Sequence, residues 1–481
     1  MRKTYRQALA VALVLLGLCP TVLAGVRATA KGSFVDSGGQ RHDWRVSEAN
    51  TLIWDNAPYL PAGVVFTSNY LSNQTDDTWQ ADVKELEDLK SKTITDVLVR
   101  AGGPATSAPA TAWQKLVNYL DEQGFTYGIE LDDGPERNAS GYIVNPRRYK
   151  LPGLTESGEL KVDLSHALGG FFVTVDPSSG AAFDSGVLYV ADNKAVLNVD
   201  VKKGPSPTLV IFPIKEMLSA RGAAPDVWQG YDETRDRLID LFGGIKFGSG
   251  LRFFMNPFRG GMAPVGEAAA MIPDCPGFRV EFEGWLSLKY EDLDSLIHAW
   301  GFTRRGATSF EVAARLIPLW WESVGVPLAY DRAADSFIEV DAPKSAMWQD
   351  ILRFRDASLQ GYMNAAADTL KRFAADVPVV FTPNAYHSIY ANSLEDQGFD
   401  GLSVAVSGSP DSVTKAAGEG YALALDSAKT TWLIGVEEVN PDSTEPASGG
   451  PRLKELGAKG FFLSARCDGK DSSLSANGNN E

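Results

Sequence analysis

The chain has 481 residues, of which 44% are hydrophobic and 22% charged, a composition typical of a well-packed globular protein and not of a disordered or fibrous one. Its 45 Lys and Arg against 61 Asp and Glu give a formal charge of -16, which disfavours nucleic acid as a partner. With only four histidines and three cysteines, a His/Cys metal cluster is hard to assemble, and we expect neither a metal nor a cofactor.

Residues 1–24 are typical of a secretory signal peptide. Three basic residues precede an apolar run from Ala8 to Leu18, which is too short to cross a membrane. The alternative is an uncleaved anchor. We expect the mature protein to be secreted or periplasmic, with no membrane attachment after cleavage. Cys275 and Cys467 would then remain, and the sequence leaves open whether they pair.

The first part of the chain alternates apolar runs with amphipathic helices. Strands are predicted at residues 61–66, 95–99 and 125–129, with helices at 79–90 and 113–122 between them. Strand, helix and strand in this order with short loops imply parallel strands joined by right-handed crossovers.

From residue 138 to 215 the pattern changes to an alternation with period two and no convincing helix. Five short strands are predicted there, at residues 160–164, 172–175, 187–190, 195–199 and 208–212. This segment is expected to form a small antiparallel β insertion on the loop side of the fold.

Alternation resumes with a helix at 232–242 and a long, mostly helical segment at 278–376. Five further strands are predicted, at residues 251–255, 377–381, 399–404, 431–436 and 460–463. Eight strands favour an α/β fold of the (β/α)8 TIM-barrel type with an inserted antiparallel β domain. An open doubly wound sheet is the alternative, weakened because no Gly-rich phosphate loop follows the first strand. The predicted parts are the signal peptide 1–24, the barrel 50–137 and 216–465, the insertion 138–215 and a disordered tail 466–481.

In such a barrel the carboxyl ends of the strands line one pocket. The polar and aromatic residues at these ends are Tyr70, Arg100, Asp132, Asp133, Asn256, Asn384, Tyr386, Glu437 and Glu438. Carboxylates and amides bind sugar hydroxyls, and flat rings stack on sugar C–H faces. We therefore expect a carbohydrate substrate bound by these residues.

Glu437 and Glu438 directly follow the buried seventh strand. Glycoside cleavage typically needs two carboxyl groups, one on each side of the bond. Because adjacent strand residues point to opposite faces, only one of the two should face the pocket, and we expect Glu437, the first after the apolar run. Arg100 is expected to hold such a carboxylate ionised through a charge-assisted bond.

The segment 282–301 carries a spaced set of aromatic, leucine and small residues, namely Phe282, Trp285, Leu286, Lys289, Tyr290, Leu293, Leu296, Ala299, Trp300 and Gly301. This set resembles a motif of glycoside hydrolase family 42 β-galactosidases, with Ile297 where that family usually has Asn. Weaker similarity covers residues 52–63 and 353–384. The resemblance implies a barrel of a large clan of retaining glycosidases, with the nucleophile at the seventh strand and the acid/base at the fourth.

The fourth strand departs from that family, which ends it with Asn-Glu. Here Asn256 is followed by Pro257, and the nearest carboxylate is Glu267. Glu267 is thus one candidate proton donor, and Asp132 or Asp133 of the third strand is another.

Two functions follow from these observations. One is an exported glycoside hydrolase, retaining in mechanism, that cleaves β-glycosidic bonds in an oligo- or polysaccharide with Glu437, Glu438 and Glu267 as catalytic residues. The other is a catalytically inactive carbohydrate-binding barrel, suggested by the missing fourth-strand glutamate. The sugar, the linkage and the oligomeric state stay open.

Overall fold

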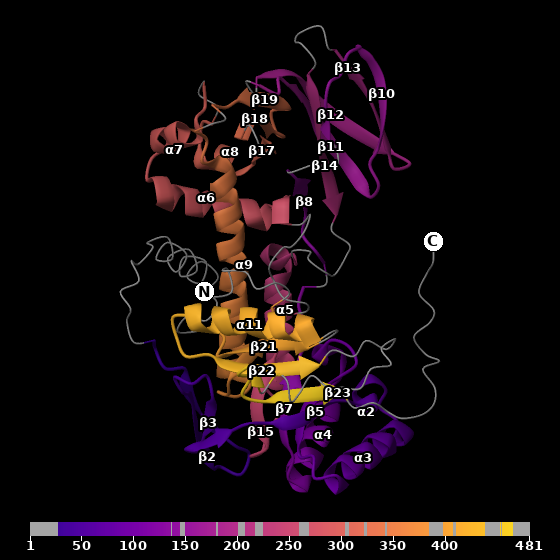
Figure 1. The fold of residues 1–481 in the computed structure, drawn as a ribbon, viewed down its shortest axis with the longest axis vertical. Helices are drawn as coiled ribbons and strands as arrows, with labels where there is room; N and C mark the ends of the chain where they lie inside the picture. The colour runs from indigo at the N-terminus through magenta and orange to yellow at the C-terminus, as the bar shows by residue number, and fades with distance from the viewer. Residues whose placement is uncertain are drawn as a thin grey trace.

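The computed structural model describes residues 27–135, 137–144, 150–178, 181–200, 207–216, 225–258, 269–303, 307–321, 325–341, 344–383, 398–406, 410–437, 453 and 455–464. Eight parallel strands close into a barrel, so the predicted (β/α)8 architecture is confirmed (Figure 1). In chain order they are β5 (Ala62–Thr67), β6 (Asp96–Arg100), β7 (Thr126–Glu130), β15 (Leu251–Met255), β20 (Val379–Phe381), β21 (Gly401–Val406), β22 (Trp432–Glu437) and β23 (Phe461–Ser464).

Aromatic rings fill the interior of the barrel. Phe253 lies 5.2 Å from Trp432 and 5.7 Å from Phe462, centroid to centroid, although these residues come from strands on different sides of the barrel. A Cβ at Gly128 would lie 2.2 Å from the Phe253 ring, so the glycine makes room for it. The barrel is therefore a packed core and not a pore.

The helices outside the barrel form where the sequence carries both an apolar stripe and a terminating signal. They are α3 (Asp76–Ser91), α4 (Ala110–Gln123), α5 (Val227–Phe242), α9 (Met347–Phe373) and α11 (Pro410–Asp426), with the short α2 (Asn69–Ser72) and the 3-10 turn η1 (Ala105–Ser107). A capping box at Thr75 starts α3, which buries Leu86 and Leu89. Gly124 ends α4 with φ of 76°, a left-handed conformation that favours glycine.

A four-stranded antiparallel sheet that the sequence analysis did not predict covers the amino-terminal end of the barrel strands. It consists of β1 (Lys31–Val35), β2 (Arg41–Val46), β3 (Leu52–Trp54) and β4 (Ala57–Tyr59). Trp44 Nε1 donates to the carbonyl of Asp376, just before β20, at 2.8 Å. Thr430 Oγ1, just before β22, donates to the carbonyl of Val46 at 2.9 Å. The opposite end, where the strands finish, is the mouth.

Between the third and fourth barrel strands lies the predicted antiparallel insertion. Its strands are β8 (Ser140–Ile143), β9 (Lys150–Leu151), β10 (Gly158–Asp163), β11 (Ala167–Val175), β12 (Ala182–Ala191), β13 (Lys194–Val199) and β14 (Thr208–Glu216), and β16 (Met271–Pro273) joins the same sheet. Phe172, Leu188 and Leu197 help to form a second, smaller apolar core there. Period-two alternation was therefore a sound guide.

The segment after the fourth strand differs from its prediction as mostly helical. It contains α6 (Pro276–Tyr290), α7 (Leu293–Trp300) and α8 (Phe310–Ala314), but also an antiparallel sheet of β17 (Leu316–Trp321), β18 (Gly325–Asp331) and β19 (Ser336–Glu339). Apolar runs such as Leu316–Trp321 fit a buried strand as well as a helix, so periodicity could not separate them.

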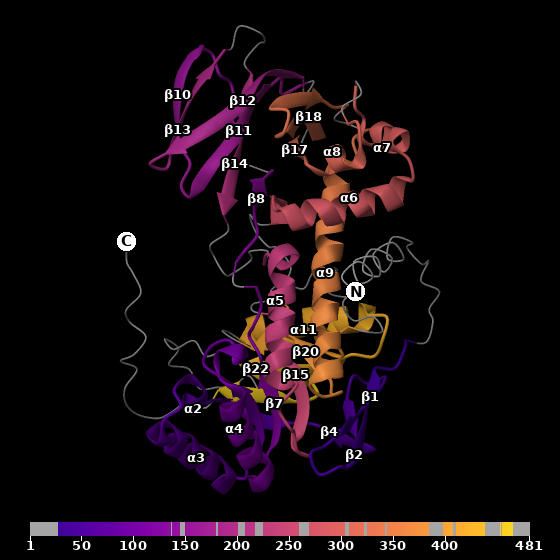
Figure 2. The ribbon, with the colours of Figure 1, turned by 180° about the vertical axis from the view of Figure 1, so that it is seen from behind.

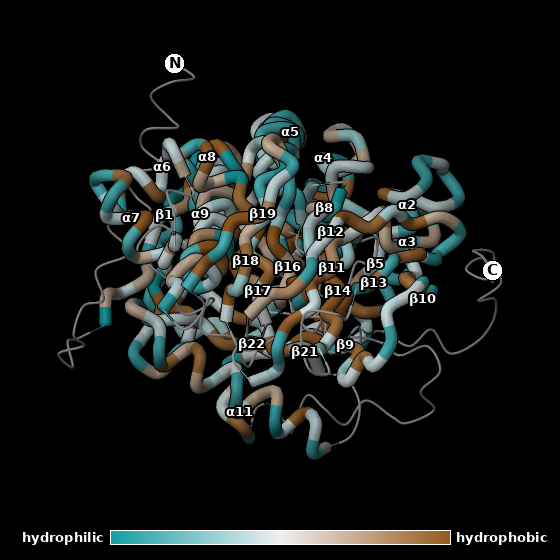
Figure 3. Tube along the Cα trace, turned by 90° about the horizontal axis from the view of Figure 1, so that it is seen from above, coloured by the Kyte–Doolittle hydropathy of each residue, from teal (hydrophilic) through white to brown (hydrophobic). Residues whose placement is uncertain are grey.

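We call the insertion together with β16–β19 and α6–α8 the upper lobe. It lies at the end of the long axis away from the barrel, with α5 and α9 running between the two parts (Figures 1 and 2). Phe171 of β11 contacts Tyr330 of β18 at 4.5 Å between ring centroids, joining the two sheets of the lobe. Seen from above, hydrophobic segments gather centrally and hydrophilic ones on the outer helices (Figure 3). Among the described helices, none combines the length and the apolar character needed to cross a membrane.

The segment 282–301, which resembles family 42 β-galactosidases, packs the upper lobe against α9. Asp350 of α9 is 1% exposed and accepts hydrogen bonds from Lys289, Tyr290 and the indole of Trp300, the last at 2.9 Å. Three of the matching residues thus satisfy one buried carboxylate.

A second buried carboxylate, Asp400, lies just before β21. Lys371 Nζ is 2.6 Å and Lys429 Nζ 3.1 Å from its oxygens. Burial alone would raise the pKa of Asp400, but the two ammonium groups outweigh it and hold this pKa below its usual value. This cluster ties the end of α9 to strands β21 and β22.

Candidate active site

Arg100, Glu130 and Asn256 meet at the mouth of the barrel. Gly128 faces the lumen beside Phe253, so strand alternation puts Glu130 on the lumen face as well. Its Oε2 forms an ion pair with Arg100, and its Oε1 accepts a hydrogen bond from Asn256 Nδ2 at 2.8 Å. Glu130 is 8% exposed. The two predicted residues are therefore joined by a carboxylate that the prediction did not include.

Asn256 is fixed in place by the neighbouring strand. Its φ of 48° is left-handed, a region in which asparagine is enriched. Its Oδ1 accepts from the backbone N–H of Thr382 at 2.7 Å, and its Nδ2 lies 3.2 Å from the Thr382 hydroxyl. Asn256 thus links the ends of the third, fourth and fifth strands.

The expected partner of Arg100 was a carboxylate of the seventh strand, and the structure corrects this. Arg100 pairs with Glu130 on the adjacent third strand. In the ring of eight strands, β7 and β22 are four positions apart in either direction, so they lie on opposite sides of the barrel. Arg100 serves the neighbouring carboxylate because adjacent strand ends are closer than opposite ones.

Glu437 is the last residue of β22. Its Oε2 is buried and has no hydrogen-bond partner among the described residues. Trp432 faces the lumen, so alternation puts Glu437 on the opposite face with Gly435, where a Cβ would lie 2.2 Å from Leu453. The described residues therefore do not fit the expectation that Glu437 faces the pocket, and Glu438 lies outside them.

The two aspartates after the third strand have different surroundings. Asp133 is 3% exposed, and its oxygens accept from Thr106, from Gly134 N at 2.8 Å and from Arg237 at 3.3 Å. Such saturation favours bracing of the loop over substrate binding. Asp132 is half-buried, with φ of 45° and its backbone N–H bonded to Asn256 O at 2.9 Å.

Tyr70, predicted at the mouth, is engaged elsewhere. Its ring packs edge-on against Trp79 of α3 at 5.2 Å, and Lys115 Nζ of α4 lies 4.6 Å from the same ring. The ring therefore contributes to the surface between α3 and α4.

Several predictions fall on residues outside the described part of the chain. These are the site residues Glu267, Asn384, Tyr386 and Glu438, the signal peptide, Cys467 and the tail from 466. Cys275 is a free, buried thiol at the start of α6. Burial raises its pKa to about 12.

Sequence reasoning missed Glu130, Thr382 and Ser464. Each stands at a strand end, and Ser464 Oγ donates to the Glu437 carbonyl at 3.1 Å. Glu130 has a signal in the sequence, because Thr126, Gly128 and Glu130 alternate along one face of a strand, and a glycine in a strand often leaves room for a large neighbouring side chain. The sequence predicts this strand only to residue 129, so it leaves Glu130 in the loop.

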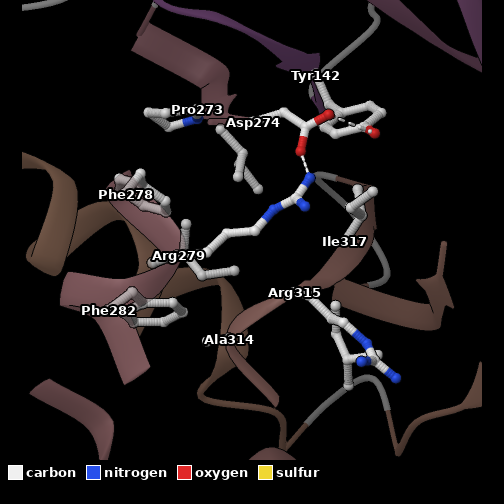
Figure 4. A pocket seen from close by; sticks show the side chains of 12 residues that line it. Tyr142, Pro273, Asp274, Phe278, Arg279, Phe282, Ala314, Arg315 and Ile317 are labelled. Carbon is white, nitrogen blue, oxygen red and sulfur yellow. Dashed lines mark hydrogen bonds and ion pairs between the residues drawn. The ribbon is translucent and has the colours of Figure 1, made fainter. Parts of the chain in front are cut away.

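The described residues were also compared with what a metal site and a second substrate pocket would need. No three His, Cys, Asp or Glu among the described residues are grouped so that they could hold a metal ion. A cavity of about 10 Å³ in the upper lobe holds at most one water. There Asp274 pairs with Arg279 and accepts from the Tyr142 hydroxyl at 3.0 Å (Figure 4). This cluster ties the insertion to α6.

No family model matches the chain, and no curated protein is significantly similar to it in sequence. Solved structures resemble its fold. The catalytic domain of β-amylase from Paenibacillus polymyxa matches with a TM-score of 0.42 and 11% identity, over 84% of this chain and 92% of that one. β-Galactosidases from Halorubrum lacusprofundi (TM-score 0.45, 13% identity) and Marinomonas ef1 (0.44, 12%) also match over 84% of this chain, which spans 52% and 53% of theirs. Similarity this low does not carry activity, substrate or site residues over to this chain.

Proposed function

We propose that this barrel is an exported glycoside hydrolase that cleaves β-glycosidic bonds with retention. Glu130 would act on one side of the bond, and one carboxylate of the Glu437–Glu438 pair on the other. The observation that carries the proposal is the position of Glu130 at the end of β7, opposite β22, the strand that Glu437 ends and that Glu438 follows in the sequence.

The surroundings of the two carboxyl groups bear on which one is ionised and which one donates a proton. Glycosidases need one ionised and one protonated carboxyl group. On one side, Glu130 is in an ion pair with Arg100 and accepts from Asn256. On the other, Glu437 ends β22 on the face turned away from the lumen, so the second group would be Glu438, the next residue in the sequence. The ion pair suits Glu130 to the ionised role, so the proton donor would come from the seventh strand, the reverse of the order that the resemblance to family 42 β-galactosidases implies.

The test is hydrolysis of aryl β- and α-glycosides and of polysaccharides by the mature protein and by Glu130→Gln, Glu437→Gln and Glu438→Gln. Glu159→Gln, exposed on β10, is the matched control. We expect a loss of about 10²–10⁴-fold for Glu130→Gln and for one of the other two, the range typical of a removed acid or base. Wild-type activity in all three variants would contradict the proposal.

Two readouts assign the roles. The anomer released first, followed by NMR, distinguishes retention from inversion. In the variants Glu130→Ala, Glu437→Ala and Glu438→Ala, added azide yields a glycosyl azide of inverted configuration where the nucleophile is missing, and of retained configuration where the acid/base is missing.

The second candidate function is a catalytically inactive carbohydrate-binding barrel. It is favoured by one observation: both oxygens of Glu130 are engaged by Arg100 and Asn256, and Pro257 stands where family 42 β-galactosidases have a glutamate. In that case no glycoside is hydrolysed, and the same Gln variants leave polysaccharide affinity largely unchanged.

A further inference from the structure

We propose that the open groove between α3 and α4 is a second carbohydrate-binding site, separate from the barrel mouth, which takes a neutral oligosaccharide. The groove has a volume of about 470 Å³ and is lined by Trp79, Thr111, Gln114, Lys115, Asn118, Tyr119 and Glu122. The choice of ligand class rests on the proposed function.

The apolar side of the groove is a cluster of rings that is incompletely buried. Trp79 contacts Tyr70 at 5.2 Å and Tyr119 at 5.5 Å, both edge-on. Trp79 and Tyr119 are half-buried, so part of each ring is open to the groove. Aromatic side chains with one apolar body and one polar edge are suited to surfaces that are partly wet.

The polar side is one stripe of α4. Thr111, Lys115, Asn118 and Glu122 are exposed and follow helical spacing, so they lie along one face of the helix. At 1.5 Å per residue the stripe is about 16 Å long, enough for more than one sugar ring.

Part of this stripe is held in a fixed orientation. Gln114 is anchored to the backbone of Lys246, donating to its carbonyl at 2.9 Å and accepting from its N–H at 2.8 Å. Gln114 also donates to Oδ1 of the exposed Asn118 at 2.8 Å, so the amide of Asn118 would offer its Nδ2 as a donor to a ligand. Lys115 Nζ lies over the Trp79 ring, 4.1 Å from its centroid, and supplies a further donor there, so a sugar C–H face would stack on the ring surface that Lys115 does not cover.

The charge of the groove points to a neutral ligand. Among its lining residues, the positive charge of Lys115 is balanced by the negative charge of Glu122. The whole chain carries a formal charge of -16, which disfavours polyanionic sugars. Rings for C–H faces and oriented donors for hydroxyls match an uncharged pyranoside chain.

The test is calorimetric titration with hexasaccharides of β-1,4-glucose, β-1,4-xylose, β-1,4-galactose and α-1,4-glucose, in a Glu130→Gln background that stops turnover. We expect one of them to occupy two sites, and the Lys115→Ala/Asn118→Ala variant to lose one site or weaken it at least tenfold. The matched control Lys161→Ala/Asn198→Ala, exposed in the upper lobe, should bind as the parent does.

Trp79→Phe, which keeps a ring, should retain most of the affinity that Trp79→Ala loses, with circular dichroism confirming that both fold. The inference is overturned if none of the four hexasaccharides binds at a site that the Lys115→Ala/Asn118→Ala variant loses or weakens. Binding at the groove without any turnover or binding at the mouth would refute the proposed function and leave this inference standing.

Discussion

Replacing Glu130 with methionine tests whether Arg100, Glu130 and Asn256 act as one fixed unit. Removing one member of a buried ion pair costs about 3–5 kcal/mol, because the other charge is left without a partner. Arg100 is 29% exposed, and water can hydrate part of its guanidinium. Asn256 keeps its bonds to Thr382. We therefore expect a smaller loss in the free energy of unfolding, about 2 kcal/mol.

The partner variant Arg100→Met should cost more than this, because it leaves a carboxylate that is 9% exposed. The double variant removes both charges, and it should lie within about 1 kcal/mol of the wild type. The double-mutant cycle then gives a coupling energy of about 3 kcal/mol or more. Urea unfolding followed by tryptophan fluorescence measures all four chains. A coupling below about 0.5 kcal/mol, typical of exposed pairs, would refute the reasoning.

Substitution or labelling of four other residues tests other contacts in the structure. Glu437→Met should raise stability by about 1 kcal/mol in urea unfolding, since it removes a buried oxygen without a partner in the described structure; a loss of that size would mean that the carboxylate is structural. Asp350→Ala should cost about 2–3 kcal/mol in the same assay, because the buried indole of Trp300 and the half-buried Tyr290 hydroxyl lose their acceptor, while the exposed Lys289 can turn to water. The pKa of Asp400 is lower in the folded chain than in the unfolded one, so its contribution to the free energy of unfolding is present above about pH 4 and is lost as pH falls through the folded pKa. The difference in the free energy of unfolding between wild type and Asp400→Asn should therefore narrow over that pH range. A difference that stays constant would contradict this. Burial raises the pKa of the Cys275 thiol to about 12, so this thiol should not react with iodoacetamide at pH 8 until the chain unfolds. Mass spectrometry of the folded protein shows whether it is modified earlier, which would contradict this.

The barrel could be predicted because each of its strands is a short apolar run bounded by polar residues, as Leu251–Met255 shows. The N-terminal sheet was missed although it carried a signal. Asp55 and Asn56 have φ of 48° and 67° and form a two-residue hairpin turn, for which these residue types are typical. These two residues also lie in the segment 52–63 that resembles family 42 β-galactosidases, but it is their turn chemistry that indicates the sheet.

The candidate site could be predicted only in part, for a geometrical reason. Arg100 and Asn256 were found because a charged or amide side chain directly follows an apolar strand. Glu130 was missed because its side is decided by the alternation inside the barrel, and that depends on Gly128 facing Phe253. Tyr70 was placed at the mouth because sequence position gives the strand end and not the direction of the ring, which Trp79 decides.

The position of the upper lobe in the chain has a consequence for how the protein is made. All of its elements precede β20, so the ribosome completes the lobe while only four barrel strands exist, from β5 to β15. Until the remaining strands arrive, β5 and β15 are open edges that can pair with other chains. The last strand, β23, must pair with the first, β5. The N-terminal sheet can form its hydrogen bonds to Asp376 and Thr430 only after these residues, just before β20 and β22, have been synthesised. Barrel closure is therefore the late, long-range step of folding, and a chain stalled before it is the species most exposed to aggregation.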